Sequence, residues 1–191
     1  MREPSYLGID ASKSSLGLCA VPRSWDGDWS RIRRETLEIK PKKTEREKIL
    51  AMLEISRDVR RFAIMCNVQW AVIEDVPTQR AFSIKPLAEL RGFIRSELAR
   101  ECQIFVEPVN QSAARKSFLG YLPTSTKLVT VDRKQIVLAA VDALTDVFQW
   151  DDEKDAFVTV NHRMARDPGV HVIQLNAPNP NAAKPRARRA A

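Results

Sequence analysis

The chain has 191 residues, of which 44% are hydrophobic and 29% are charged, a composition typical of one globular domain with a sizeable core. No apolar run approaches the ~18 residues of a membrane span, and charge follows the first Met too soon for a signal peptide. The three cysteines stand singly in apolar surroundings, without the spacing of a zinc site, so we expect a reducing compartment, the cytoplasm.

The positive charge is unevenly distributed along the chain. The whole chain carries +7, and setting aside the four cations of residues 176–191 leaves +3 for the body. A positive field favours polyanions such as nucleic acid, but charge alone is weak support for a body so mildly basic. We expect residues 1–175 to form one domain. Residues 176–191 are predicted to be a disordered basic tail that contacts phosphates without reading sequence.

The N-terminal third predicts three strands and a capped helix. Residues 6–10 and 16–21 are apolar runs joined by a short polar connection, which indicates a β-hairpin. Residues 36–39 fit a third strand. Thr44 and Glu47 then have the spacing of a capping box, in which each side chain satisfies a free backbone N–H at a helix start. Apolar residues recur at helical spacing after them.

The remaining elements alternate between helix and strand. Their expected ranges are a strand at 70–73, a helix at 87–98, a strand at 104–106 and, after a polar loop, helices at 136–147 and 152–164. Asp151 or Asp152 can cap the last helix. A hairpin-led sheet with later strands joined by helices predicts an α/β fold with a central mixed five-stranded sheet flanked by helices.

Four acids fall where this fold would gather them. Asp10 ends the first strand and Glu74 ends the fourth, while Asp152 and Asp155 share one face of the last helix. The carboxyl ends of buried strands form the usual site crevice, and acids crowded there repel unless a cation neutralises them. Oxygen-rich sites suit Mg²⁺ or Mn²⁺. Two such ions roughly 4 Å apart can hydrolyse a phosphodiester.

Each acid also has a simpler interpretation. Asp10 could be a strand-end turn residue, and Glu74 with Asp75 could be a solvated strand end. Asp152 could be the helix N-cap, and Asp155 a first-turn acid favoured by the helix dipole. Only the ensemble favours a functional site, because no single position is specific.

Four short motifs stand in order along the chain. They are Leu7-Gly8-Ile9-Asp10 followed by Gly17, Ala71-Val72-Ile73-Glu74-Asp75-Val76, Leu90-Arg91-Gly92 followed by Phe105-Val106-Glu107, and Asp152-Glu153-Lys154-Asp155-Ala156. Together they resemble the motifs of the RuvC family of Holliday junction resolvases. The resemblance covers residues 6–165. It implies an RNase H-like fold, catalytic metal ligands at Asp10, Glu74, Asp152 and Asp155, two Mg²⁺ ions replaceable by Mn²⁺, and branched DNA as substrate.

The resemblance also suggests residues that contact DNA. Family members carry basic residues after the fifth strand and at the start of the next helix, where Arg115 or Lys116 and Arg133 or Lys134 stand here. A cation near a scissile phosphate steadies developing charge. A solvated surface charge is the alternative for each of them.

Two departures from the family pattern indicate a divergent or phage-type branch. Bacterial members usually follow the first Asp with Pro-Gly, where this chain has Ala11 and Ser12. They often carry an aromatic residue just past the Glu that helps to open the junction. Here Pro77 occupies that region, and Phe82 is the nearest substitute.

The leading hypothesis is therefore an endonuclease that resolves branched DNA in recombination and repair. It would act as a homodimer, because a symmetric junction needs two equivalent sites, with the helix at 87–98 as the candidate interface. Alternatives are a nuclease for RNA–DNA hybrids and a non-catalytic DNA-binding module of the same fold. An actin-like ATPase ranks lower, because six glycines and 191 residues are too few for its phosphate turn and second lobe.

Overall fold

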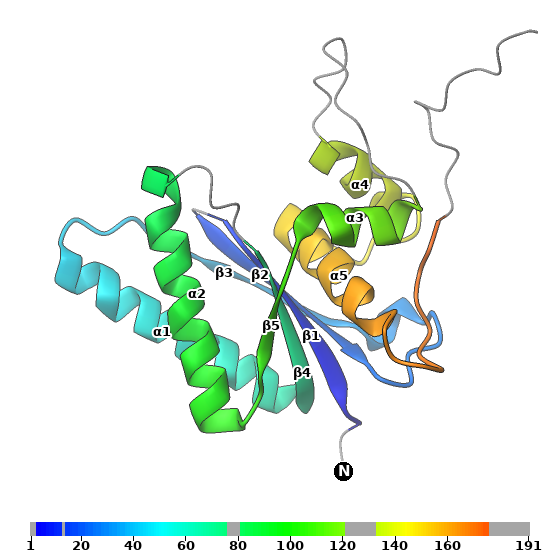
Figure 1. Ribbon diagram of the computed structural model, residues 1–191, viewed down its shortest axis with the longest axis horizontal. Helices are drawn as coiled ribbons and strands as arrows, with labels where there is room; N and C mark the ends of the chain where they lie inside the picture. The colour runs from blue at the N-terminus through cyan, green and yellow to red at the C-terminus, as the bar shows by residue number, and fades with distance from the viewer. Residues whose placement is uncertain (1–2, 13, 76–80, 121–132, 176–191) are drawn as a thin grey trace, which may run out of the picture.

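The computed structural model describes residues 3–12, 14–75, 81–120 and 133–175, with five strands and five α-helices among them (Figure 1). The strands are β1 (Ser5–Ala11), β2 (Ser15–Pro22), β3 (Arg33–Glu38), β4 (Val68–Glu74) and β5 (Val106–Val109). The helices are α1 (Glu45–Met65), α2 (Ala81–Cys102), α3 (Gln111–Leu119), α4 (Arg133–Asp142) and α5 (Asp151–Met164).

The sheet is mixed, in the order β3-β2-β1-β4-β5. The hairpin strands β1 and β2 pair antiparallel, and β2 pairs antiparallel with β3. The strands that follow helices, β4 and β5, run parallel to β1. The predicted α/β fold with a mixed five-stranded sheet is confirmed.

Helices cover both faces of the sheet, with α1 and α2 on one side and α3, α4 and α5 on the other (Figure 1). Side chains alternate between these faces along each strand. Leu7 and Ile9 of β1 pack in the core beneath α1 and α2, whereas Tyr6 lies in the second core, with residues of α5. Asp10 lies four residues after Tyr6 in the same strand, so the alternation directs its side chain to the same face, the one covered by α5.

Two glycines let α5 lie directly on the hairpin. A Cβ added to Gly8 would stand 2.0 Å from the carbonyl oxygen of Ala156, and one on Gly17 would stand 2.2 Å from that of Asp152. Both obstacles are backbone atoms, which cannot rotate away. Gly17 is also the partner of Asp10 in the β1–β2 register. The same glycine therefore brings the start of α5 beside the end of β1.

Helix starts follow local capping chemistry, although not always as predicted. The Thr44–Glu47 capping box before α1 is confirmed. The prediction for α5 was wrong, because the N-cap is Trp150, and the Glu153 carboxylate accepts hydrogen bonds from the backbone N–H groups of Gln149 and Trp150. Asp152 therefore does not cap the helix.

Several boundaries also differ from the sequence prediction. The structure has a helix, α3, where a polar loop was expected, and it begins at an Asn110 cap and ends at Gly120, whose φ is 81°. Helix α2 begins before the predicted 87–98, with Pro86 inside it, and β5 begins two residues later and ends three residues later than the predicted 104–106. The predicted tail at 176–191 lies outside the described residues. None of the helices in the described part of the chain combines the length and apolar character that crossing a membrane requires.

Candidate functional site

Parallel pairing of β1 with β4 brings the first two predicted acids together. Ile9 pairs with Ile73 in the register, so Asp10 and Glu74 follow at the same level of neighbouring strands. Their carboxyl groups share a hydrogen bond. Asp10 is 4% exposed, and Glu74 is half-buried. One proton held between two carboxyl groups relieves repulsion that two buried negative charges would suffer.

Helix α5 supplies the other two acids from its first two turns. Asp152 and Asp155 are 9% and 3% exposed. The hydroxyls of Ser12 and Ser15, from the β1–β2 turn, both donate to Oδ2 of Asp152. The negative charge of Asp155 acts on both Asp10 and Glu74. The structure therefore brings all four sequence-predicted acids to one end of the sheet.

Two basic side chains neutralise this cluster from the side of α3 and α4. The Nζ of Lys134 lies 2.9 Å from Oδ2 of Asp155 and 3.7 Å from Oδ1 of Asp152. The guanidinium of Arg115, itself buried, lies 3.4 Å from Oδ1 of Asp155. Asp152 and Asp155 thus converge on a single ammonium group, which shows that a positive charge can be held between them.

The pKa shifts report how strongly the site disfavours negative charge. Burial raises the pKa of Asp10 well above its usual range, and the hydrogen bond and negative charge of Glu74 raise it further. Burial also raises the pKa of Glu74, although the hydrogen bond from Asp10 opposes this. The pKa of Lys134 is raised by the charge of Asp155 and its hydrogen bond, against the opposing and largest effect of burial.

The donor chemistry fits a hard cation, but the side chains are not arranged around one. Among the described residues, no group of three His, Cys, Asp or Glu side chains is positioned to hold a metal ion. The reason is visible in the contacts, because Lys134 lies against Asp155 and Asp10 shares its hydrogen bond with Glu74. Four clustered carboxyl groups, three of them buried and Glu74 half-buried, remain the kind of ligand set that Mg²⁺ or Mn²⁺ prefers.

The structure separates some of the basic candidates. Arg115 points into the acid cluster, whereas Lys116 is exposed on α3. Of Arg133 and Lys134, the second pair of candidates, Lys134 contacts Asp155. The side chains of Arg133 and Phe82 lie outside the described residues. Ser12 and Ser15 were not predicted, although three serines in a hairpin turn next to a buried acid are a signal that the sequence carries.

Removing metal should make stability depend on pH through Asp10. Its pKa is raised in the folded chain, so the folded state binds the proton more tightly than the unfolded state does. The contribution of Asp10 to the free energy of unfolding is therefore fully present below the pKa of the unfolded carboxyl group, about 4. It is lost as the pH rises through the pKa of Asp10 in the folded chain. In EDTA, Asp10→Asn should have a higher Tm than the parent at pH 7, with the difference closing near pH 4. A difference in Tm that stays constant between pH 4 and pH 7 would contradict the description of Asp10 as a buried carboxyl group that shares a proton with Glu74.

The described chain resembles solved structures of one kind of enzyme. The Thermus thermophilus RuvC structure matches with a TM-score of 0.61 at 14% identity, over 82% of this chain and 90% of that chain. T. thermophilus RuvC in complex with Holliday junction substrate matches with a TM-score of 0.59 at 13% identity, over 83% and 90%. A fowlpox virus resolvase in complex with Holliday junction DNA matches at 0.49 and 14%, over 85% and 97%.

The sequence itself matches neither a protein-family model nor a curated protein. The likeness therefore lies in the backbone. The chain has the RuvC-like variant of the RNase H-like fold, which confirms the family resemblance at the level of fold.

Proposed function

We propose that the chain is a metal-dependent endodeoxyribonuclease that cleaves four-way or other branched DNA. The observation that carries the proposal is the convergence of Asp10, Glu74, Asp152 and Asp155 at one end of the sheet. Crowding several acids in a buried place is costly, and groups with perturbed pKa values cluster at functional sites. The RuvC-like fold supports the choice of branched DNA.

The four acids would hold two Mg²⁺ ions, and Mn²⁺ could replace them. When bound, the ions supply water activation and stabilisation of the leaving oxygen in phosphodiester hydrolysis. Ser12 and Ser15 orient the Asp152 carboxylate through their hydroxyl donors. Lys134 and Arg115 balance the carboxylates in the metal-free chain. Lys134, the more exposed of the two, would stabilise the charge of an entering phosphate once metal ions take its place beside the acids.

A groove reaches this cluster. It has a volume of about 730 Å³ and is lined by residues of the β1–β2 turn, of β3 and of the α5 start, with Ser15, Trp150 and Asp152 among them. Because Asp152 lines the groove, a strand lying in it would pass one of the proposed ligands.

The test is a comparison of substrates at equal concentration. A labelled four-way junction, a duplex of the same sequence and an RNA–DNA hybrid are incubated with the protein, with Mg²⁺ and with EDTA. We expect cleavage of the junction alone, near the branch point and only with Mg²⁺. Preferred cleavage of the hybrid would replace the proposed substrate, and binding without any cleavage would favour a non-catalytic module.

We also propose that the chain acts as a homodimer through the outer face of α2. A junction has two strands to cut symmetrically, which a C₂ dimer does with two equivalent sites. On α2, Leu90, Ile94 and Leu98 are buried within the chain. Gly92 lies on the opposite, exposed face, where an added Cβ meets nothing within 4 Å.

Gly92→Arg therefore tests the interface without disturbing the fold of the single chain. We expect the parent to sediment as a dimer and Gly92→Arg to sediment as a monomer with an unchanged circular dichroism spectrum. Lys85→Ala, at an exposed position near the start of the same helix, serves as the control and should remain dimeric. Monomeric parent protein, both free and with junction DNA, would contradict the proposal.

A further inference from the structure

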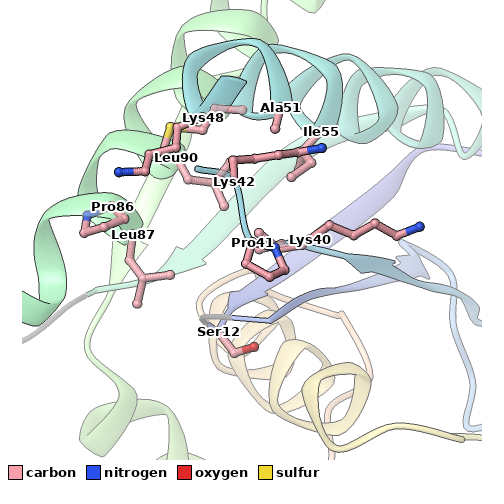
Figure 2. A pocket seen from close by; sticks show the side chains of 12 residues that line it. Ser12, Lys40, Pro41, Lys42, Lys48, Ala51, Ile55, Pro86, Leu87 and Leu90 are labelled. Atoms are coloured by element: carbon pink, nitrogen blue, oxygen red, sulfur yellow. The ribbon is translucent and has the colours of Figure 1, made fainter. Parts of the chain in front are cut away.

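A second cavity lies on the other side of the hairpin turn from the groove described above. Figure 2 shows it between the segment after β3, helix α1 and the start of α2. Its volume is about 390 Å³, within the ~300–1,000 Å³ range of pockets that accept small ligands. The interior is aliphatic, with Met52 and Ile55 from α1 and Pro86, Leu87 and Leu90 from α2.

The rim of this cavity is cationic. Lys40, Lys42 and Lys48 all line it, and no acid is among the described lining residues. Lys48 has an ion pair to Glu45 at 3.4 Å, and Lys40 has one to Glu38 at 3.9 Å. All four of these side chains are exposed, and exposed pairs contribute only about 0–1 kcal/mol. The lysines can therefore exchange these partners for phosphates.

The cavity is joined to the acid cluster by one residue. Ser12 lines the cavity, and its hydroxyl lies 3.4 Å from Oδ2 of Asp152. Ser12 also follows Asp10 by two positions along the chain. A strand whose phosphate reaches the acids therefore has its neighbouring nucleotide within reach of the cavity mouth.

From this arrangement we infer that the cavity binds one unstacked nucleotide of the DNA strand being cut. The aliphatic interior takes the base, and the three lysines take the phosphates on either side of it. Enzymes that act on a base show that a nucleotide can leave the stack and enter a protein pocket, and that this costs least where pairing is already broken. A branch point is such a place. This inference rests on the proposed function, since it names the part of the substrate that selects the cleavage position.

The test uses junctions that carry 2-aminopurine, in turn, at each position near the branch point. Fluorescence is measured on binding without Mg²⁺, so that no strand is cut. We expect one position to brighten with the parent protein, which reports an unstacked base. Ala51→Phe, which fills the cavity from α1, should abolish this signal and weaken junction binding about tenfold. Ala51→Ser, which leaves the cavity open, should behave like the parent.

Two further comparisons isolate the cavity from general effects. Lys48→Glu should weaken binding more than Arg46→Glu, because both reverse one charge on the first turns of α1 but only Lys48 lines the cavity. An abasic nucleotide at the bright position should cost the parent about as much affinity as Ala51→Phe does, and the two changes together should cost no more than either.

The outcomes separate this inference from the proposed function. A parent protein that binds no junction overturns both. A parent that binds the junction, with Ala51→Phe binding equally well and giving the same fluorescence, overturns only the nucleotide subsite. Ala51→Phe that changes the sedimenting species instead of DNA binding also overturns it, because the cavity would then belong to an interface between two copies of the chain.

Discussion

Asp10→Asn should abolish junction cleavage while leaving the chain folded and able to bind DNA. The change keeps the size of the side chain and removes one anionic ligand. Loss of an outer partner of a metal ligand already costs about 10- to 100-fold in metal affinity or activity, so loss of a ligand should exceed that. Binding should persist or strengthen, because DNA then meets less negative charge. Glu74→Gln should behave in the same way.

The matched control is Asp142→Asn. This residue ends α4, and its side chain is 52% exposed. The substitution removes one negative charge from the same side of the sheet but not from the acid cluster or the groove, so its cleavage rate should stay near that of the parent. If Asp10→Asn and Asp142→Asn cut equally well at saturating Mg²⁺, the assignment of the site would fail.

Asp155→Asn should differ from Asp10→Asn in stability while matching it in lost cleavage. Asp155 pairs with Lys134 and Arg115. Its neutralisation leaves the buried Arg115 guanidinium without the counter-charge described for it and leaves Lys134 with only the longer contact to Asp152. We expect a lower Tm in EDTA for Asp155→Asn and a higher Tm for Asp10→Asn. Thermal unfolding of both variants at pH 7 measures the contrast, and equal shifts would contradict the described ion pairs.

Gly17→Ala should be among the most destabilising single changes in the chain. Its Cβ would lie 2.2 Å from the backbone carbonyl of Asp152, so either β2 or the start of α5 must move. Overpacking costs about 1–3 kcal/mol and occasionally more, and a rigid backbone obstacle puts this case at the upper end. A loss of that size lowers Tm by about 10 °C in a domain of this length.

Gly92→Ala provides the opposite result from the same chemical change. Its added Cβ meets nothing within 4 Å, and Ala is favoured over Gly in a helix by about 1 kcal/mol. Thermal unfolding should therefore show Gly17→Ala below the parent and Gly92→Ala at or above it. Cleavage by folded Gly17→Ala should also fall, because displacement of α5 separates Asp152 from Asp10. Equal Tm values for the two variants would contradict the packing of α5 on β2.

Much of this arrangement could be predicted from the order of strands and acids. The alternation along β1 and β4 fixes the shared face of Asp10 and Glu74, and three-residue spacing fixes the shared face of Asp152 and Asp155. The contacts of Lys134 and Arg115 could not be predicted, since they depend on how α3 and α4 pack against α5. Choosing between Arg115 and Lys116 required knowing which of them faces the acid cluster on helix α3. The sequence prediction had a loop in place of this helix.

Other differences reflect local signals that compete with one another. Asn110 and Gly120 are ordinary cap residues, so α3 could have been recognised from them. The first residue of α5 is harder to predict, because Asp is a preferred N-cap residue and Trp is not, so Asp151 and Asp152 are better candidates than Trp150. The carboxylate of Glu153 satisfies the N–H groups of Gln149 and Trp150 instead. Asp152 is left for the hydroxyls of Ser12 and Ser15, which come from a distant part of the chain.

The most direct test of the central claim is where a metal ion binds. A crystal of the full chain grown with Mn²⁺ can be measured for anomalous scattering. We predict strong anomalous density within bonding distance of Asp10 and Asp155, with Glu74 and Asp152 completing the ligands and Lys134 moved away from Asp155. Lys134 remaining on Asp155 in crystals grown with Mn²⁺, with no anomalous density among the four carboxylates, would contradict the account.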